Sequence, residues 1–495
     1  MKIVFRVDAS LQIGSGHVMR CLSIANVLKA KKHTIHFLCL DLPGNFIAFI
    51  KESGYPVTSL PYIESHTGSQ EYSRWLTRPE EIDAQQFLLH CDEASLVIVD
   101  HYGIGSRWES LVRETLQCPI IAIDDLVRDH EADLIIDQTL ARQPEEYTSR
   151  AQILSGQEYA ILAPTFCLHR EQALERSGYT MPPRILVSFG GIDEHNMTLK
   201  ALEQLSQHSF QVTVLLSERS PHYQTISRFA ERYEHITHIT FCSKMAELML
   251  QHDIAIGAPG TTSWERACLG LPSIIVPIAN NQQTMCQKLA QHGIALAIEP
   301  NDIDRLTDHI EQLLHQWHTL HRNSLAVCDG LGAFRVASAI NQFAIPEKRI
   351  SLRRATLSDA QLTFQWQQHP DTRRYALTKK TPSWEEHLAW FTNKLKSYTD
   401  YFYLIVKDGV NVGVVRLDRQ KAHHYLVSIY IDPNCYGQGL AIAALSNLDT
   451  IHPHIHIHAT VLVENVASQA LFKRANYQQV SATSFIRSPI LEEAL

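Results

Sequence analysis

A loop near the start of the chain contains residues that could carry out acid–base chemistry. Gly14-Ser15-Gly16-His17 follows a short hydrophobic stretch and precedes a segment typical of a helix. Glycines let backbone N–H groups approach a ligand closely, and a helix N-terminus favours an anion. A neutral imidazole at His17 can take a proton from water or from a hydroxyl, and Arg20 lies one helical turn further on. The structural alternative is a glycine turn with a histidine that caps the helix.

A second set of loops, in the middle of the chain, has the residue types that bind a nucleotide. Gly190 and Gly191 follow a hydrophobic stretch, and Gly260 begins a turn that enters a helix containing Glu265. Such a helix start can bind a diphosphate, and the glutamate could accept hydrogen bonds from a ribose. Each signal is weak alone, because a helix glutamate is more often simply solvated. Two facing loop sets, one with a base and one with an anion site, predict a cleft for a nucleotide diphosphate.

A third glycine-containing loop lies near the C-terminus. Gly437 and Gly439 follow a hydrophobic stretch and are spaced so that N–H groups could surround a pyrophosphate at a helix start. Asn465 and Ser468 come later, where the next helical segment begins. A glycine pair alone is weak evidence, but the two features together are considerably more specific.

A row of alternating histidines precedes that last helical segment. His452, His454, His456 and His458 would share one face if they formed a strand. Four imidazoles on one face could bind zinc or nickel. We favour the alternative, a strand with polar residues on one face of a sheet, and predict no metal site.

The elements that position these loops follow from the hydrophobic pattern. Stretches that are hydrophobic throughout and alternate with helical segments predict two doubly wound α/β lobes. After a change of character at residues 345–349 the strands become more polar and mixed, so we predict domains at 1–180, 181–345 and 346–495. The predicted strands are Lys2–Val7, Ile35–Leu40, Leu96–Asp100, Pro119–Asp124, Leu134–Asp137, Ile185–Phe189, Gln211–Leu216, Ile254–Ile256, Ser273–Pro277, Tyr403–Val406, Asn411–Leu417, Tyr425–Ile431 and His458–Val463; the main predicted helices are Val18–Ala30, Ile303–Gln316 and Ala467–Tyr477.

Composition narrows the setting in which the protein works. The 495 residues carry a formal charge of −8, without a long basic block, which disfavours a nucleic-acid partner. No stretch has the length of a membrane span, and the first residues lack the uninterrupted hydrophobic core of a signal peptide. The ten cysteines include no C-x-x-C pair, which favours reduced thiols. We therefore expect a cytoplasmic protein without a membrane partner; its oligomeric state stays open.

The chain up to about residue 345 resembles the UDP-2,4-diacetamido-2,4,6-trideoxy-β-L-altropyranose hydrolases of pseudaminic acid biosynthesis. The resemblance implies a two-lobed GT-B fold, release of UDP by cleavage of the sugar C1–O bond, and His17 as the base that activates water. One departure is Ala163, where the family often has an arginine that contacts the substrate. The motifs that carry the resemblance are Ile13–Leu22, Val99–Tyr102, Ile123–Asp125, Ser188–Asp193, Gly260–Glu265 and Asn281–Gln282. The residues predicted to bind the substrate are Gly14, Gly16, Arg20, Tyr102, Gly190, Gly191, Gly260, Thr261, Thr262, Glu265, Asn281 and Gln282.

Residues from about 350 to 488 resemble the GNAT acetyltransferases. Besides the third loop and the helix after it, the similarity includes an opening segment, Ile350–Thr356, and Asp359. It implies acetyl-CoA as co-substrate, with the pyrophosphate on the 436–441 loop and the thioester carbonyl polarised by a backbone N–H near Ile429 and Tyr430. The predicted cofactor-binding residues are Ile429, Ile431, Tyr436, Gly437, Gln438, Gly439, Ala441, Asn465 and Ser468.

Three positions depart from the GNAT pattern. Tyr436 replaces an arginine or glutamine at the head of the loop, and Phe472 replaces a tyrosine that often protonates the thiolate. Leu426 stands about where the central strand often has an acid. Because the CoA thiolate leaves without much help, we still expect acetyl transfer. The base stays open: His423 and His424 are candidates, with solvated surface histidines as the alternative.

Taken together, the sequence predicts a fold of the α/β class, a GT-B-like pair of Rossmann-type lobes followed by an α+β GNAT domain. The predicted function is a bifunctional nucleotide-sugar enzyme of pseudaminic acid biosynthesis. One part would hydrolyse the UDP-diacetamido sugar, and the other would N-acetylate its UDP-linked 4-amino precursor with acetyl-CoA. The alternative is a UDP-sugar glycosyltransferase of GT-B type with a degenerate CoA-fold binding module.

Overall fold

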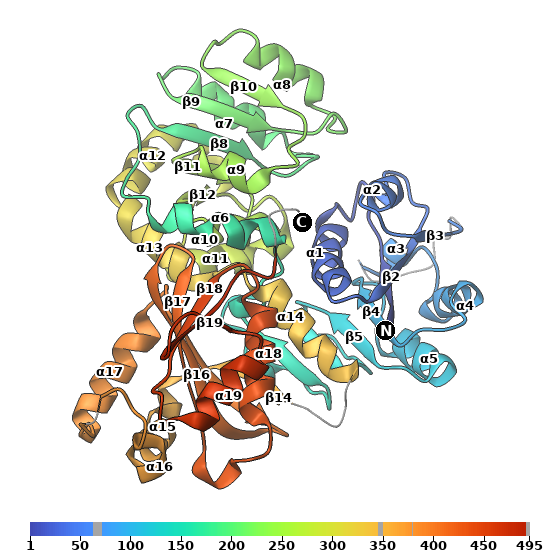
Figure 1. The fold of residues 1–495 in the computed structure, drawn as a ribbon. Helices are drawn as coiled ribbons and strands as arrows, with labels where there is room; N and C mark the ends of the chain where they lie inside the picture. The colour runs from blue at the N-terminus through green and yellow to red at the C-terminus, as the bar shows by residue number, and fades with distance from the viewer. Residues whose placement is uncertain (63–71, 345–349, 379, 492–495) are drawn as a thin grey trace. The chain divides into compact units, whose positions relative to one another are not determined.

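The computed structural model describes residues 1–62, 72–344, 350–378 and 380–491, and the chain divides into two compact units, residues 1–336 and 337–495. Unit 1 contains two parallel sheets, and unit 2 contains a third, mixed sheet (Figure 1). The change of character at residues 345–349 lies outside the described residues. The bounds of the three predicted domains stay predictions.

The first sheet of unit 1 has seven parallel strands in the order β3-β2-β1-β4-β5-β6-β7. The strand order reverses at β1, which lies between β2 and β4, and a doubly wound sheet has its ligand crevice at such a point. The strands are β1 (Lys2–Val7), β2 (Thr34–Leu40), β3 (Val57–Leu60), β4 (Leu96–Asp100), β5 (Ile120–Ile123), β6 (Leu134–Asp137) and β7 (Gln152–Ser155). The helices are α1 (Gly16–Ala30), α2 (Ile47–Glu52), α3 (Ser73–Leu76), α4 (Glu80–His90), α5 (Ser106–Leu116) and α6 (Pro164–Leu174).

The second sheet of unit 1 has six parallel strands in the order β10-β9-β8-β11-β12-β13, so its strand order reverses at β8. The strands are β8 (Arg184–Ser188), β9 (Gln211–Leu215), β10 (Ile236–Ile239), β11 (Ile254–Gly257), β12 (Ser273–Ile275) and β13 (Leu296–Ala297). The helices are α7 (Met197–Leu205), α8 (Tyr223–Ala230), α9 (Met245–Leu250), α10 (Thr261–Cys268), α11 (Gln283–Gln291), α12 (Leu306–His315), α13 (Trp317–Val327) and α14 (Gly332–Asn341), the last of which extends past residue 336.

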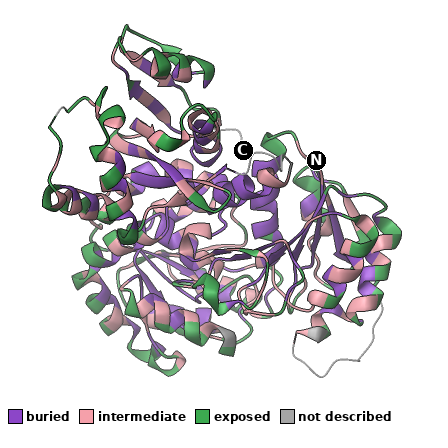
Figure 2. Cartoon of the chain, turned by 90° about the horizontal axis from the view of Figure 1, so that it is seen from below, coloured by how far each residue is buried: buried purple, intermediate pink, exposed green. Residues whose placement is uncertain are grey.

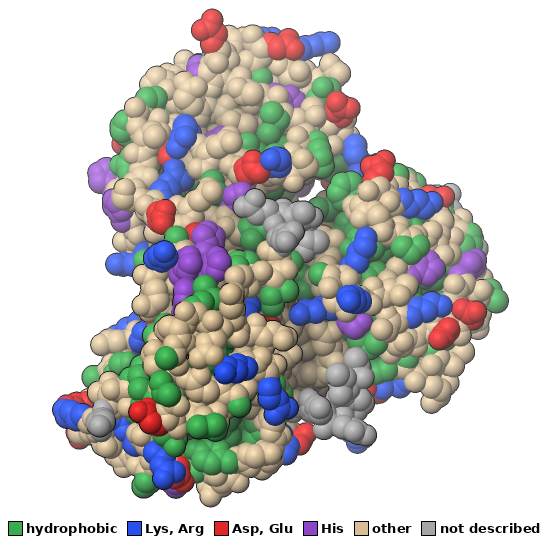
Figure 3. All heavy atoms as spheres, in the orientation of Figure 1, with side chains coloured by type: hydrophobic (Ala, Val, Ile, Leu, Met, Phe, Trp, Pro, Cys, Tyr) green, Lys and Arg blue, Asp and Glu red, His purple; other side chains and the backbone are tan. Residues whose placement is uncertain are grey.

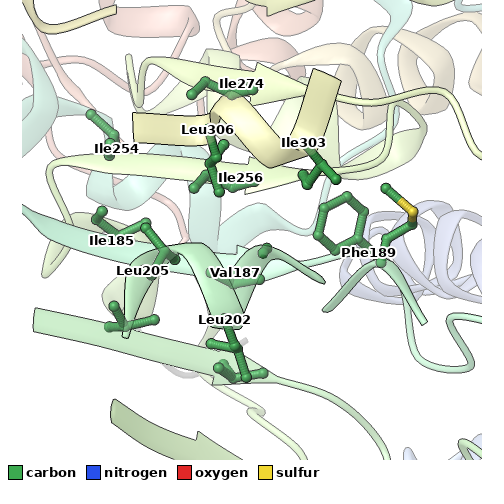
Figure 4. Packing of buried hydrophobic residues seen from close by; sticks show 14 of the residues in the cluster. Ile185, Val187, Phe189, Leu202, Leu205, Ile254, Ile256, Ile274, Ile303 and Leu306 are labelled. Atoms are coloured by element: carbon green, nitrogen blue, oxygen red, sulfur yellow. The ribbon is translucent and has the colours of Figure 1, made fainter. Parts of the chain in front are cut away.

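Side chains of the central strands of this second lobe form its core. Ile185 and Val187 of β8 and Ile254 and Ile256 of β11 are fully buried and pack against covering helices (Figure 4). The helical partners labelled in Figure 4 are Leu202 and Leu205 of α7, Ile303 and Leu306. Figure 2 shows the same division more widely, with strands buried along their length and helices exposed on their outer sides. Strands buried on both faces explain why the hydrophobic runs in the sequence do not alternate.

The sheet of unit 2 has the order β14-β15-β16-β17-β18-β20-β19 and is antiparallel except where β17 meets β18. The parallel pairing of β17 and β18 covers only three residues of each strand, from His424–His456 to Leu426–His458, although both strands continue. The strands are β14 (Ile350–Arg354), β15 (Tyr401–Lys407), β16 (Val410–Lys421), β17 (His424–Ile431), β18 (His456–Thr460), β19 (Gln478–Gln479) and β20 (Ser484–Arg487). The helices are α15 (Ala360–Gln368), α16 (Pro370–Arg373), α17 (Trp384–Lys396), α18 (Leu440–Ile451) and α19 (Val466–Arg474).

The structure confirms the predicted fold class, two Rossmann-type lobes followed by an α+β domain. The prediction that four alternating histidines lie on one strand is wrong for His452 and His454. β18 begins only at His456, and His452 ends α18, where it is buried and lies 2.9 Å from the hydroxyl of Tyr403. Pro453 lies between His452 and the strand and supplies no N–H for a sheet, and His454 precedes the first residue of β18.

Two further sequence features can be compared with the structure. Within the described ranges, no helix has both the length and the hydrophobicity to cross a membrane. All ten cysteines are free thiols, and those in the two lobes are buried except for Cys242.

Gly257 at the end of β11 provides a test of how tightly the second sheet is packed. A Cβ at this position would lie 1.9 Å from the carbonyl oxygen of Ser188 on the neighbouring strand, so β8 and β11 would have to separate. We expect Gly257→Ala to destabilise the lobe by about 1–3 kcal/mol in chemical unfolding followed by tryptophan fluorescence. Gly178→Ala is the matched control, since no atom lies within 4 Å of a Cβ there. Equal stability of the two variants would contradict this packing.

Candidate functional site

His17 and Asp100 meet at the crevice of the first sheet. His17 lies in the first turn of α1, and Asp100 is the last residue of β4. The imidazole Nδ1 is 2.6 Å from Oδ1 of Asp100, whose side chain is fully buried. A carboxylate can only accept a hydrogen bond, so Nδ1 carries the proton and Nε2 keeps a free lone pair. This tautomer is the one a general base requires.

Arg20 fixes Asp100 in this arrangement. Its Nε and Nη2 donate to the two carboxylate oxygens of Asp100 at 2.6 Å each, and its side chain is 5% exposed. Burial by itself would raise the pKa of Asp100, but Arg20 and His17 hold that pKa well below its usual range. The carboxylate therefore stays ionised, and it orients the imidazole at any physiological pH.

Aromatic side chains form one wall beside His17. The ring centroid of Tyr102 lies 4.8 Å from that of His17, edge-on, and Trp75 stacks on Tyr102 at 5.6 Å. The Tyr102 hydroxyl donates to Oδ1 of Asp125 at 2.5 Å. Burial and the neighbouring Asp125 raise the pKa of Tyr102 well above its usual value, so the phenol stays neutral. The wall presents flat, hydrophobic surface next to the base, a surface type that suits the C–H face of a sugar.

A second histidine at this end of the sheet, His101, is not equipped to act as a base. Its Nδ1 accepts a hydrogen bond from the N–H of Gly103 at 3.0 Å, and its Nε2 lies 3.4 Å from Asp8. Burial lowers the pKa of His101 to about 4, even though Asp8 opposes the shift. Asp8 in turn pairs with the buried Arg6 at 2.7 Å. His101 is thus neutral and enclosed in the interior, with its Nε2 lacking a hydrogen-bond partner among the described residues, so His17 is the better candidate for the base.

The loops of the second lobe gather at the carboxyl ends of β8, β11 and β12, which are neighbours in the sheet. Gly190 and Gly191 follow β8, Gly260 precedes α10, and Gln282 follows β12. A Cβ built at Gly14, Gly190 or Gly260 would meet no atom within 4 Å, so these loops border open space. A Cβ built at Gly16 would lie 3.7 Å from the hydroxyl of Thr261, and the two lobes therefore face each other at the His17 loop and the start of α10.

The other residues predicted to bind the substrate lie on α10 and in the turn that contains Gln282. Burial raises the pKa of Glu265, in the second turn of α10, to about 7, with Arg266 opposing the shift. Thr262 lies with Thr261 in the first turn of that helix. Gln282 accepts a hydrogen bond from the N–H of Ile278 at 2.8 Å, so its side chain shapes its own turn. The side chain of Asn281 lies outside the described residues.

In unit 2, the third loop adopts the conformation that its glycines allow. Gly437 and Gly439 have φ angles of 79° and 74°, the left-handed region that favours glycine. Tyr436 at the head of the loop is 49% exposed, and α18, which contains Ala441, begins directly after Gly439. Lys407 at the end of β15 donates to the side-chain oxygen of Gln438 at 2.8 Å. The loop thus offers backbone N–H groups and a nearby cation to an anion.

The separation of β17 and β18 completes this second site. Beyond Leu426, β17 pairs only with β16, so the stretch that contains Ile429 and Ile431 has a neighbouring strand on one side only. Asn465 caps α19 by accepting from the N–H of Ser468 at 3.1 Å. Phe472, by contrast, is 4% exposed and packs against Phe485, as core residues do. Backbone beside the gap, rather than Phe472, is therefore available to a thioester.

Several functional candidates were not predicted from spacing. Asp100 could have been found as an acid at the end of a buried strand, whereas its pairing with His17 depends on the fold. No local sequence pattern indicates Trp75 or Lys407 as a residue of either site. Among the described residues, no three His, Cys, Asp or Glu side chains are grouped so that they could hold a metal ion.

Comparisons with known proteins agree with this two-part organisation. Residues 349–478 match the family described as the acetyltransferase (GNAT) domain, and residues 192–343 match the glycosyltransferase family 28 C-terminal domain. An uncharacterised protein of Methanocaldococcus jannaschii is 24% identical over 97% of both chains. The UDP-2,4-diacetamido-2,4,6-trideoxy-β-L-altropyranose hydrolase of Campylobacter jejuni is 24% identical over 59% of this chain and 97% of its own length. Spore coat polysaccharide biosynthesis protein SpsG of Bacillus subtilis is 22% identical over 69% of this chain and 98% of its own.

Among solved structures, MurG of Acinetobacter baumannii aligns with a TM-score of 0.47 and 15% identity, covering 69% of this chain and 99% of MurG. The curated relatives and the family matches confirm both resemblances that the sequence motifs predicted. The chain thus combines a part similar to the UDP-2,4-diacetamido-2,4,6-trideoxy-β-L-altropyranose hydrolases with a C-terminal domain that matches the GNAT acetyltransferase family.

Proposed function

We propose that unit 1 hydrolyses UDP-2,4-diacetamido-2,4,6-trideoxy-β-L-altropyranose to UDP and the free sugar. The observation that carries this proposal is the His17–Asp100–Arg20 arrangement, which holds Nδ1 of His17 on Asp100 and leaves Nε2 to accept a proton, in a loop whose Gly16 lies next to Thr261 of α10. The similarity to the Campylobacter jejuni hydrolase supports the choice of substrate.

The arrangement suits an inverting displacement by water. Nε2 of His17 accepts a proton from a water molecule, whose oxygen attacks C1 on the face opposite to UDP. The C1–O bond breaks, and its electron pair stays on the UDP phosphate, a good leaving group that needs no strong acid. Asp100 stabilises the imidazolium that forms, and the N–H groups at the start of α10 stabilise the charge on UDP.

We further propose that unit 2 transfers an acetyl group from acetyl-CoA to the amine of the UDP-linked 4-amino precursor. The 436–441 loop would hold the pyrophosphate, and the backbone beside the gap between β17 and β18 would polarise the thioester carbonyl. Acetyl-CoA supplies the activated acyl group. The two reactions would be consecutive steps of pseudaminic acid biosynthesis, since the amide made by unit 2 is part of the substrate of unit 1.

A glycosyltransferase is the second candidate for unit 1, and the match to glycosyltransferase family 28 favours it. It would deliver a sugar hydroxyl rather than water to C1. Release of UDP without an acceptor separates the two functions: a hydrolase releases it, and a transferase does not. For unit 2 the corresponding alternative is a module that binds acetyl-CoA without transferring its acetyl group.

Replacement of the base tests the hydrolytic half. We expect His17→Asn to lower kcat for UDP release by on the order of 10²–10⁴, because water loses its proton acceptor. Acetyl transfer by the same protein should stay at the wild-type rate, and an unchanged affinity for UDP in calorimetry serves as the folding control for unit 1. Product analysis by NMR should show the inverted anomer in the wild type. Undiminished UDP release by the variant would remove His17 from the mechanism.

Glu265 should make UDP binding depend on pH. Ribose hydroxyls donate stronger hydrogen bonds to its carboxylate when it is ionised, and its pKa of about 7 lies inside the physiological range. The affinity for UDP should therefore fall as pH drops below 7, by up to about tenfold per unit. In Glu265→Gln, calorimetry should find weaker binding that lacks the contribution of Glu265 to the pH profile and keeps only that of the UDP phosphate. The exposed Glu203→Gln is the control, and an unchanged pH profile in Glu265→Gln would exclude the ribose contact.

Two glycines with the same strained conformation test the coenzyme loop. Gly439 and Gly409 have φ angles of 74° and 80°, and a Cβ would have at least 4 Å of space at both. Alanine should therefore cost about 1–2 kcal/mol of backbone strain at either position. We expect Gly439→Ala to weaken acetyl-CoA binding at least about tenfold in calorimetry, while Gly409→Ala, in the β15–β16 turn, leaves it unchanged. Equal affinities would place the coenzyme elsewhere.

A further inference from the structure

Acetyl transfer to an amine at neutral pH requires a group that removes the proton of the ammonium ion. The side chains that meet at the point where β17 and β18 separate are Leu426 and His458, which are partners in the parallel register. Leu426 cannot bind a proton. His458 lies directly beside it on the same face of the sheet, at the closed end of the gap proposed for the thioester.

His458 is held by a second histidine. Nδ1 of His424 lies 2.8 Å from Nε2 of His458, and both side chains are half-buried. The ring of His424 also stacks on that of His456, with centroids 4.4 Å apart. Figure 3 shows histidine side chains gathered at the surface in the region of β17 and β18. When Nε2–H of His458 donates to His424, the Nδ1 lone pair of His458 is free to accept a proton.

The surroundings keep this pair neutral. Burial lowers the pKa of His424 and of His458, and Lys421 at the end of β16 lowers both further. The other ionisable groups around the pair are His423, His456 and, on β20, Arg487, which lowers the pKa of His456. The largest contributions to the pKa shifts of these three histidines come from burial and from neighbouring cationic or imidazole groups. A neutral imidazole is the form that can act as a base.

Another side chain on this face of the sheet that could accept a proton is Asp418, and it is already paired with cations. Asp418 of β16 is the register partner of Leu426 on its other side. Its carboxylate pairs with Lys394 at 2.7 Å and with Arg416 at 2.9 Å. Asp418 is thus engaged by two cationic side chains, whereas Nδ1 of His458 is left to accept a proton when its Nε2 donates to His424.

We propose that His458 is the general base of the acetyltransferase reaction and that His424 positions it. This inference rests on the acetyl transfer proposed for unit 2. His458 takes a proton from the ammonium group, and the free amine attacks the thioester carbon, forming the C–N bond. The C–S bond then breaks, and the thiolate takes the proton that nitrogen loses on becoming an amide. The imidazolium releases its proton to water, so the products are amide, CoA thiol and one proton.

The test uses the full chain, with acetyl-CoA and the UDP-linked 4-amino sugar, and follows the CoA thiol released. We expect His458→Ala to lower kcat at pH 7 by on the order of 10²-fold, with the KM for acetyl-CoA unchanged. The deficit should shrink as pH rises toward the pKa of the amine, which then needs no base. Added imidazole should restore part of the rate in His458→Ala. His424→Gln, which keeps a hydrogen-bonding side chain, should show a smaller loss.

Two controls separate a catalytic from a structural role. UDP release by unit 1 should be unaffected in every variant, and His454→Gln, a histidine of the same row outside β18, should keep the wild-type pH profile of acetyl transfer. An unchanged pH profile in His458→Ala, or a loss of acetyl-CoA affinity equal to the loss of rate, would overturn the assignment. If the wild-type chain itself transfers no acetyl group, the function proposed for unit 2 fails, and His458 as its base fails with it.

Discussion

The buried carboxylate of Asp100 is the constraint on which the first site depends. It lies at the end of a central strand, where water cannot solvate it, so its charge must be balanced by neighbouring donors. Arg20 provides two hydrogen bonds and His17 provides the third. Since both partners come from one turn of α1, balancing the charge also fixes the helix start and the direction of the imidazole. The contacts that balance the charge of Asp100 in the folded lobe therefore also orient the imidazole of His17.

The two units solve the problem of positioning a reaction in different ways. In unit 1 the carboxyl ends of the parallel strands bring side chains to one edge of each sheet. The proposed reaction there depends on side chains such as His17 and Glu265. In unit 2 the sheet itself opens, because β17 and β18 stop pairing after Leu426. There the backbone of β17 has a neighbouring strand on one side only, and His458 lies at the closed end of the gap.

The sequence contains enough local information to predict most of the architecture. Unbroken hydrophobic runs such as Leu96–Asp100 identify buried parallel strands, and glycine turns identify helix starts such as that of α10. Interactions between distant segments leave no such trace. The pairing of His17 with Asp100 spans 83 residues, and the stacking of Trp75 on Tyr102 depends on where a short helix docks. The histidine row misled the prediction because alternation was taken to continue across the proline at position 453.

The presence of both units in one polypeptide has a consequence for metabolism. Separate enzymes can be made in different amounts, and their ratio can be adjusted by expression or degradation. Here each molecule carries one copy of unit 1 and one of unit 2, so their stoichiometry is fixed at synthesis. For the two proposed steps, the balance of fluxes must then be set by turnover rates and substrate affinities. Any imbalance would have to be corrected by mutation inside a site rather than by gene dosage.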